Sequence, residues 1–179
     1  MFPRLALLAL PALAALAPVA VAQSPAPPSP DGAATLPPWI AADTAARSVR
    51  LELETTPGTP SASINGRREG GLTIVVPLGW TVTWRWRSTD TAATHSLVLV
   101  VQREKLPERG GRPAFPNAMT RMVTAGLPAG RTDETTFVAE EAGWYWLLCG
   151  VPTHALNGEW IEFRVDPAAK GAGLIVRER

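Results

Sequence analysis

The sequence predicts an all-β domain, a sandwich or a barrel of short strands. From Trp39 onward, β-branched and aromatic residues come in short runs, Gly, Pro and Asp separate the runs, and no stretch shows a convincing helical period. The clearest run is residues 80–87, where four large apolar residues from Trp80 to Trp86 alternate with Thr and Arg. A period of two places the four apolar side chains on one face of a strand.

Six further runs fit short strands. Residues 160–165 repeat the alternation, with three apolar side chains on one face and Trp, Glu and Arg on the other. The other runs are apolar segments bounded mostly by turn residues, at residues 49–54, 71–76, 95–101, 135–139 and 143–149. The long connection at residues 102–133 is rich in Gly, Pro and Arg, so we expect it to be functional or to run over the surface.

The N-terminal segment differs in composition from this domain. Arg4 precedes an apolar run at residues 5–22 that ends in Ala-Val-Ala, the small-x-small pattern of a cleavage site. Residues 1–22 are therefore predicted to be a secretory signal peptide, with a retained membrane anchor as the alternative. Residues 23–38 are dominated by Pro, Ala, Ser and Gly and are predicted to be a tether, which leaves residues 39–179 as one domain.

Charge and cysteine content narrow the range of functions. The chain has 17 basic and 16 acidic residues, and without Arg4 the two signs are equal in number. A neutral chain with no basic run lacks the electrostatic footprint of a nucleic-acid-binding protein. The single cysteine, Cys149, cannot form an internal disulfide, and in an oxidising compartment a bound metal would protect its thiol. We predict a monomer that is periplasmic or extracellular, or membrane-anchored if the N-terminal segment is retained.

One short loop carries half of a metal site. Cys149 ends the expected strand at residues 143–149, and His154 follows five residues later. The other histidine, His95, begins an expected strand after the turn-like residues 90–94, so all three side chains lie at strand ends. If these ends coincide, one thiolate and two imidazoles converge, a set that suits copper and that zinc can also use.

The residues around this loop resemble the cupredoxins, and most closely sulfocyanin. The sulfocyanin copper loop has a Cys, four residues, a His, four residues and a Met, and Cys149 and His154 keep that spacing. Further likeness lies in the segments at residues 94–97, 114–118 and 143–145. The resemblance spans roughly residues 70–165, and it implies a Greek-key β-sandwich of the cupredoxin type with about seven to eight strands.

The resemblance also implies the metal ligands. Carried over residue by residue, it makes Cys149 the thiolate ligand, His95 and His154 the equatorial imidazoles, and position 159 the axial ligand. Glu159 stands where the family has Met. A carboxylate is harder than a thioether and can be anionic, so as an axial ligand Glu159 would favour Cu(II) and lower the reduction potential.

Other interpretations of these residues stay open. Cys149 could be a small buried hydrophobe, or a nucleophile with a histidine base. Zinc could take the same four residues in a closed tetrahedral site. Glu159 could be a solvated turn residue, and Met119 or Met122 of the long connection could supply a thioether in its place.

The pattern favours electron transfer by an exported protein with one copper ion, rather than an enzyme. The electron would pass through the edge of His154, and redox proteins would dock on the apolar surface around it, which includes Pro152, Ala155 and Leu156. Two alternatives belong to other classes of protein. One is a red-copper-like site with an open position for a small-molecule ligand or substrate, and the other is a copper storage or delivery protein.

Overall fold

The structure, a computed structural model, describes residues 36–177 of the chain. This range forms ten strands and contains no α-helix. The strands are β1 (Ile40–Asp43), β2 (Ser48–Thr56), β3 (Ser63–Ile64), β4 (Leu72–Pro77), β5 (Thr81–Ser88), β6 (Val98–Val101), β7 (Thr132–Val138), β8 (Gly143–Leu148), β9 (Trp160–Asp166) and β10 (Gly173–Val176).

The predicted signal peptide at residues 1–22 and most of the predicted tether at residues 23–38 lie outside the described residues. Between residues 36 and 177, no helix is long and apolar enough to cross a membrane.

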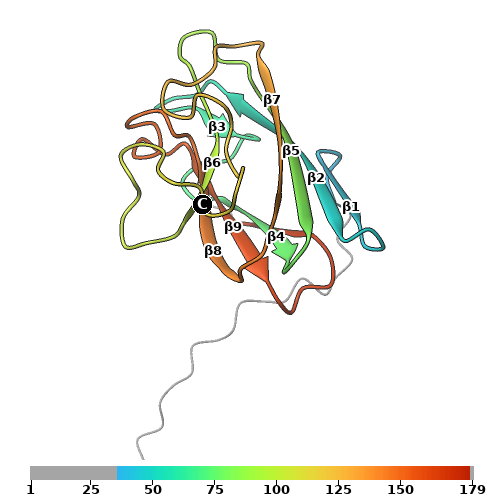
Figure 1. The fold of residues 1–179 in the computed structure, drawn as a ribbon. Helices are drawn as coiled ribbons and strands as arrows, with labels where there is room; N and C mark the ends of the chain where they lie inside the picture. Colours follow the sequence, from blue (N-terminus) through green and yellow to red (C-terminus); the bar gives the residue numbers. More distant parts are fainter. Residues whose placement is uncertain (1–35, 178–179) are drawn as a thin grey trace, which may run out of the picture.

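The strands form two five-stranded sheets that pack face to face (Figure 1). One sheet has the order β1-β2-β5-β7, with β3 paired to β2, and the other has the order β10-β4-β9-β8-β6. Both sheets are mixed, because β2 pairs with β5 and β4 pairs with β9 in parallel, while the other neighbours are antiparallel. The predicted all-β sandwich is confirmed.

The core between the sheets follows the sequence pattern. Val82, Trp84 and Trp86 of β5 are fully buried, and the Thr and Arg residues between them are partly or fully exposed. β4 lies between β10 and β9 and is buried along its whole length, as expected for a central strand with a parallel neighbour. Phe137 of β7 packs edge-on against Trp84, with ring centroids 5.1 Å apart. Together these side chains belong to one continuous apolar core.

Each of the seven predicted runs overlaps one observed strand, and β1, β3 and β10 were not predicted. These three strands have only four, two and four residues, which is too short for the alternation to be recognised. The run expected at residues 95–101 becomes a strand only at Val98. His95 instead forms an isolated antiparallel bridge with Leu127.

The connection between β6 and β7, residues 102–131, has two roles in the described structure. It contributes the side chain of Phe115 to the core, where this residue is 1% exposed. Gly110 approaches the loop after β8, where its backbone N donates a 2.8 Å hydrogen bond to the carbonyl of Gly150. The connection therefore borders and supports the loop in which the sequence places half of the metal site.

Candidate metal centre

Cys149 directly follows β8 and starts the loop that leads to β9, here called the Cys-His loop (residues 149–159). It is completely buried. The backbone N of Cys149 donates to the carbonyl of Glu159 at 3.1 Å, and the backbone N of Glu159 donates to the carbonyl of His154 at 3.1 Å. Gly158 has a φ of 109°, and a Cβ there would lie 2.8 Å from the side chain of Glu69. Glycine thus allows the loop to close with Glu159 beside Cys149.

His154 lies at the outer side of the Cys-His loop. Its Nδ1 is 3.5 Å from the Sγ of Cys149 and 3.2 Å from the Oε2 of Glu159. Its side chain is 23% exposed, whereas Cys149 has no exposed surface. His154 therefore directs one ring nitrogen inward while part of its ring reaches solvent.

His95 comes from a distant segment, just before β6. Its backbone N donates to the carbonyl of Leu127 at 3.1 Å and its carbonyl accepts from Leu127 N at 2.7 Å. The side chain is 2% exposed. Its Nδ1 lies 3.9 Å from the Sγ of Cys149, and its Nε2 lies 3.0 Å from the Oδ2 of Asp90. Both ring nitrogens are therefore engaged.

Glu159 is buried at 1% exposure, so it is not the solvated turn residue that its place after a glycine allowed. Its two oxygens lie 3.0 and 2.9 Å from the Nδ1 of His95. The hydroxyl of Thr55, on β2, donates to the Oε1 of Glu159 at 3.3 Å and accepts from the Nε1 of Trp86 at 3.1 Å. The carboxylate is thus oriented by a hydrogen-bond chain from the opposite sheet.

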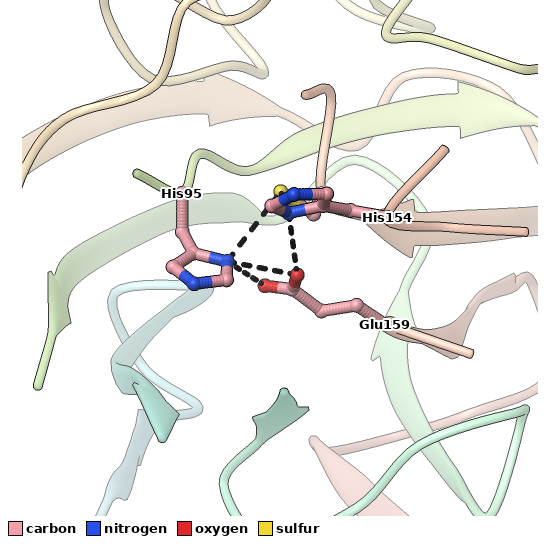
Figure 2. Close-up of side chains that lie close together, drawn as sticks. His95, His154 and Glu159 are labelled. Carbon is pink, nitrogen blue, oxygen red and sulfur yellow. Dashed lines mark hydrogen bonds and ion pairs between the residues drawn. The ribbon is translucent and has the colours of Figure 1, made fainter. Parts of the chain in front are cut away.

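The structure brings all four predicted ligand residues together, with their ligand atoms within 4.8 Å of one another. Figure 2 shows the rings of His95 and His154 and the carboxylate of Glu159 turned toward one another. One sulfur, two imidazole nitrogens and one carboxylate oxygen form a donor set that fits copper, and zinc can use the same set. Met119 and Met122 are 40% and 62% exposed, outside this buried cluster.

The charges of the four side chains compensate one another. Burial by itself would lower the pKa of His95, but hydrogen bonds with Cys149 and Glu159 outweigh burial and raise the pKa to about 10. Hydrogen bonds with the same two groups raise the pKa of His154 to about 9. Burial acts to raise the pKa values of Cys149 and Glu159, yet hydrogen bonds with the two histidines lower both. The thiolate and the carboxylate are therefore favoured in their ligating forms.

Three residues around the cluster were not recognised from the sequence. Asp90 and Thr55 contact His95 and Glu159, as described above. The hydroxyl of Ser96 accepts a 3.0 Å hydrogen bond from the backbone of Gly150 and donates a 2.6 Å bond to the carbonyl of Val123. Only Asp90 carried a sequence signal, a carboxylate five residues before a histidine, and that signal is also ordinary turn chemistry.

A family model described as the sulfocyanin (SoxE) domain matches residues 38–170. The chain belongs to the sulfocyanin family. The match confirms the resemblance to the cupredoxins, a family of copper proteins, that the segments around the Cys-His loop indicated. In this family member Glu159 occupies the position at which the resemblance places a Met.

Several solved structures are similar to this sulfocyanin-family chain. Auracyanin from the photosynthetic bacterium Roseiflexus castenholzii is 24% identical, with 65% of this chain and 97% of that chain covered and a TM-score of 0.46. Rusticyanin from Thiobacillus ferrooxidans is 20% identical, with 67% and 82% covered and a TM-score of 0.41. Auracyanin A, a "blue" copper protein from Chloroflexus aurantiacus, is 19% identical, with 65% and 99% covered and a TM-score of 0.46. No curated protein sequence matches the chain.

Proposed function

We propose that this protein is an exported carrier of single electrons in which His95, Cys149, His154 and Glu159 hold one copper ion. The observation that supports this most is the convergence of the four donor side chains in a sulfocyanin-family sandwich. Bound copper would supply the one-electron couple between Cu(I) and Cu(II). The carboxylate of Glu159 favours the more highly charged ion, so the potential is lower than with a neutral thioether at this position.

The protein holds each donor before any metal arrives, which suits electron transfer because little has to move when the oxidation state changes. His95 is fixed through both ring nitrogens. The backbone of Cys149 is paired with that of Glu159, and Thr55 holds the Glu159 carboxylate. The chain's own contribution is therefore a set of four donors, three of them buried, that the protein's own hydrogen bonds hold in place.

The proposed electron route is the ring of His154. Its side chain is 23% exposed, compared with 2%, 0% and 1% for His95, Cys149 and Glu159. Leu156, which is 53% exposed, and the partly exposed Pro152 lie two residues on either side of His154 in the loop, and we expect them to form an apolar surface near this ring. Ala155, which the sequence placed on that surface, is 1% exposed and packs in an apolar cluster with residues of β6 and β8. Redox proteins would dock through the exposed apolar residues.

Export is part of the proposal and rests on residues 1–22. Mass spectrometry of the protein recovered from the periplasm or the medium of expressing cells is expected to show a chain that begins at Gln23. A full-length chain found only in the membrane fraction would support the retained anchor instead.

The proposed copper site is tested by its colour. Copper-loaded wild-type protein is expected to absorb in the visible range through thiolate-to-copper charge transfer, and Cys149→Ser is expected to lose this absorption because an oxygen replaces the sulfur. Absence of visible absorption in the copper-loaded wild type would overturn the proposal.

Small anions separate electron transfer from ligand chemistry at the metal. Azide or nitrite added to the copper-loaded protein is expected to leave the visible spectrum unchanged, because three of the four donor residues are at most 2% exposed. A spectrum that changes with anion concentration would favour an open coordination position. Copper that exchanges rapidly with a chelator in both oxidation states would favour storage or delivery.

A further inference from the structure

Asp90 lies in the turn between β5 and His95, and both of its carboxylate oxygens are engaged. Its Oδ1 accepts a 2.8 Å hydrogen bond from the backbone N of Ala92. Its Oδ2 accepts a 3.0 Å hydrogen bond from the Nε2 of His95. Its own backbone N donates to the hydroxyl of Ser88 at 3.2 Å. The side chain is only 12% exposed, and these hydrogen bonds hold its carboxylate with Oδ2 toward His95.

This contact determines which nitrogen of His95 is available to a metal. A carboxylate only accepts hydrogen bonds, so the Nε2 that faces Asp90 carries a proton. Nδ1, which faces Cys149 and Glu159, is then the nitrogen that gives up its proton to a metal, because Nε2 keeps the proton that it donates to Asp90. Hydrogen bonds of this kind fix the tautomer and the orientation of a metal-binding imidazole and raise its basicity.

We propose that Asp90 is a positioning residue that fixes the tautomer and the ring orientation of His95 and, by its negative charge, favours the oxidised metal. The inference rests on the proposed copper function. Asp90 follows β5, and Thr55, which contacts Glu159, belongs to β2 of the same sheet. This sheet therefore helps to orient side chains of the metal site in addition to forming one half of the sandwich. Residues of that sheet and of the turn after β5 orient both His95 and the carboxylate of Glu159.

Asp43 shows what a turn aspartate without this role looks like. Its Oδ1 accepts a 2.9 Å hydrogen bond from the backbone N of Ala46, the same kind of turn contact that Asp90 makes with Ala92. Asp43 is exposed and lies in β1, whereas Asp90 is buried and reaches a ligand residue with its second oxygen. Asp43→Asn is therefore a matched control for Asp90→Asn.

The Asp90→Asn variant distinguishes the role of Asp90 in the turn from its role in orienting His95. Its oxygen can keep the bond from Ala92, which leaves the NH2 group facing the Nε2 of His95. An NH2 group is a donor, so it favours a His95 with its proton on Nδ1, the wrong tautomer for metal binding. We expect Asp90→Asn to bind copper about 10- to 100-fold more weakly than wild type. Asp90→Ala, which loses both bonds, serves as the second variant.

The experiment measures Cu(I) and Cu(II) affinity by competition with chelators, the reduction potential and the Cu(II) EPR spectrum for the wild type, Asp90→Asn, Asp90→Ala and Asp43→Asn. The expected result is a greater loss for Cu(II) than for Cu(I) in both Asp90 variants. A loss ten times greater for Cu(II) raises the potential by about 59 mV. Asp43→Asn is expected to match the wild type in all four readouts.

Two failures are distinguishable. A copper-loaded wild type without thiolate-to-copper absorption would overturn the proposed function whatever Asp90 does. A coloured wild type whose affinities, potential and EPR spectrum are unchanged in Asp90→Asn would leave the function intact and overturn the positioning role. Since Asp90→Asn can keep the turn bond to Ala92, it decides the question even if Asp90→Ala does not fold.

Discussion

His95 and His154 both direct Nδ1 toward the candidate metal site, but the ring of His95 is buried and the ring of His154 is partly exposed to solvent. His95 is 2% exposed, and its nitrogens contact Glu159 and Asp90. His154 is 23% exposed, and its contacts with Cys149 and Glu159 both involve Nδ1. The difference separates two tasks that one donor set has to perform. We expect the histidine held on both sides to fix the geometry of the site, and the partly exposed histidine to be the one that a redox partner would approach.

The largest effect is expected when the imidazole ring of each histidine is removed in turn. His95→Gly and His154→Gly are both expected to lose the visible absorption of the copper-loaded protein. Added imidazole is expected to restore it only in His154→Gly, because the missing ring there left a space open to solvent, as judged from its 23% exposure. The measurement is an imidazole titration followed in the visible range, with Cys149→Ser as the variant that no imidazole rescues. Equal rescue of both glycine variants would remove the distinction between the two histidines.

Glu159 contacts both histidines, at 2.9 Å for His95 and 3.2 Å for His154, so its replacement tests what they share. Glu159→Met is expected to raise the reduction potential by at least about 59 mV, which corresponds to a tenfold shift in favour of Cu(I). Its spectrum should become more like that of a blue copper protein. Glu162→Gln, at a buried carboxylate of β9 that pairs with Arg177, is the control. Unchanged potential and colour in Glu159→Met would show that the carboxylate is not a ligand.

The copper-free protein should distinguish the two rings by pH. Folding raises the pKa of His95 to about 10 and of His154 to about 9, so both stabilise the fold below pH 6.5 and lose that effect as pH rises through these values. Folding lowers the pKa of Cys149, which acts in the opposite direction, but two histidine protons outweigh one thiol proton. The free energy of unfolding is therefore expected to fall between about pH 6.5 and pH 10.

Chemical denaturation at a series of pH values measures this fall, and NMR titration should show His154 losing its proton before His95. The copper-loaded protein is the control, since its histidines bind without the Nδ1 proton and the fall should be absent. A copper-free protein whose stability rises between these pH values would contradict the account.

The smallest expected effect comes from the support behind the carboxylate. Thr55→Val removes the hydrogen bond to Glu159 and leaves the buried Nε1 of Trp86 without its acceptor, at a cost of about 1–3 kcal/mol in the free energy of unfolding. Thr83→Val, on the outer face of β5, loses only a bond with Thr136 and should cost less than about 1 kcal/mol. Denaturant unfolding of both variants gives the two values. Equal losses of unfolding free energy in the two variants would mean that the hydrogen bonds of Thr55 with Glu159 and Trp86 add no stability beyond that of a surface threonine pair.

The parts of the molecule that could be predicted are those encoded within a few residues. The alternation from Trp80 to Trp86 defines one face of a strand, and the spacing of Cys149 and His154 fits on one loop. The arrival of His95 was expected only on the condition that strand ends coincide, and the structure meets that condition. Local periodicity and spacing were sufficient for these features.

The remaining parts depend on contacts between distant segments. The burial of Glu159 follows from closure of the Cys-His loop and from Thr55, about a hundred residues away, which no local pattern encodes. In the sequence Asp90 is an ordinary turn residue, and its contact with His95 depends on the fold, in which the bridge to Leu127 holds the backbone of that histidine. Ala155 was expected on the apolar docking surface because it follows His154 in the loop, but its side chain is 1% exposed and packs with residues of β6 and β8.

The most direct measurement is copper X-ray absorption on the loaded wild type, with Cys149→Ser and Glu159→Met in parallel. The central claim predicts one sulfur, two imidazoles and one further oxygen around a single copper in the wild type, loss of the sulfur in Cys149→Ser, and a second sulfur in place of the oxygen in Glu159→Met. A wild-type copper surrounded only by oxygen and nitrogen, with a spectrum unchanged by Cys149→Ser, would contradict it.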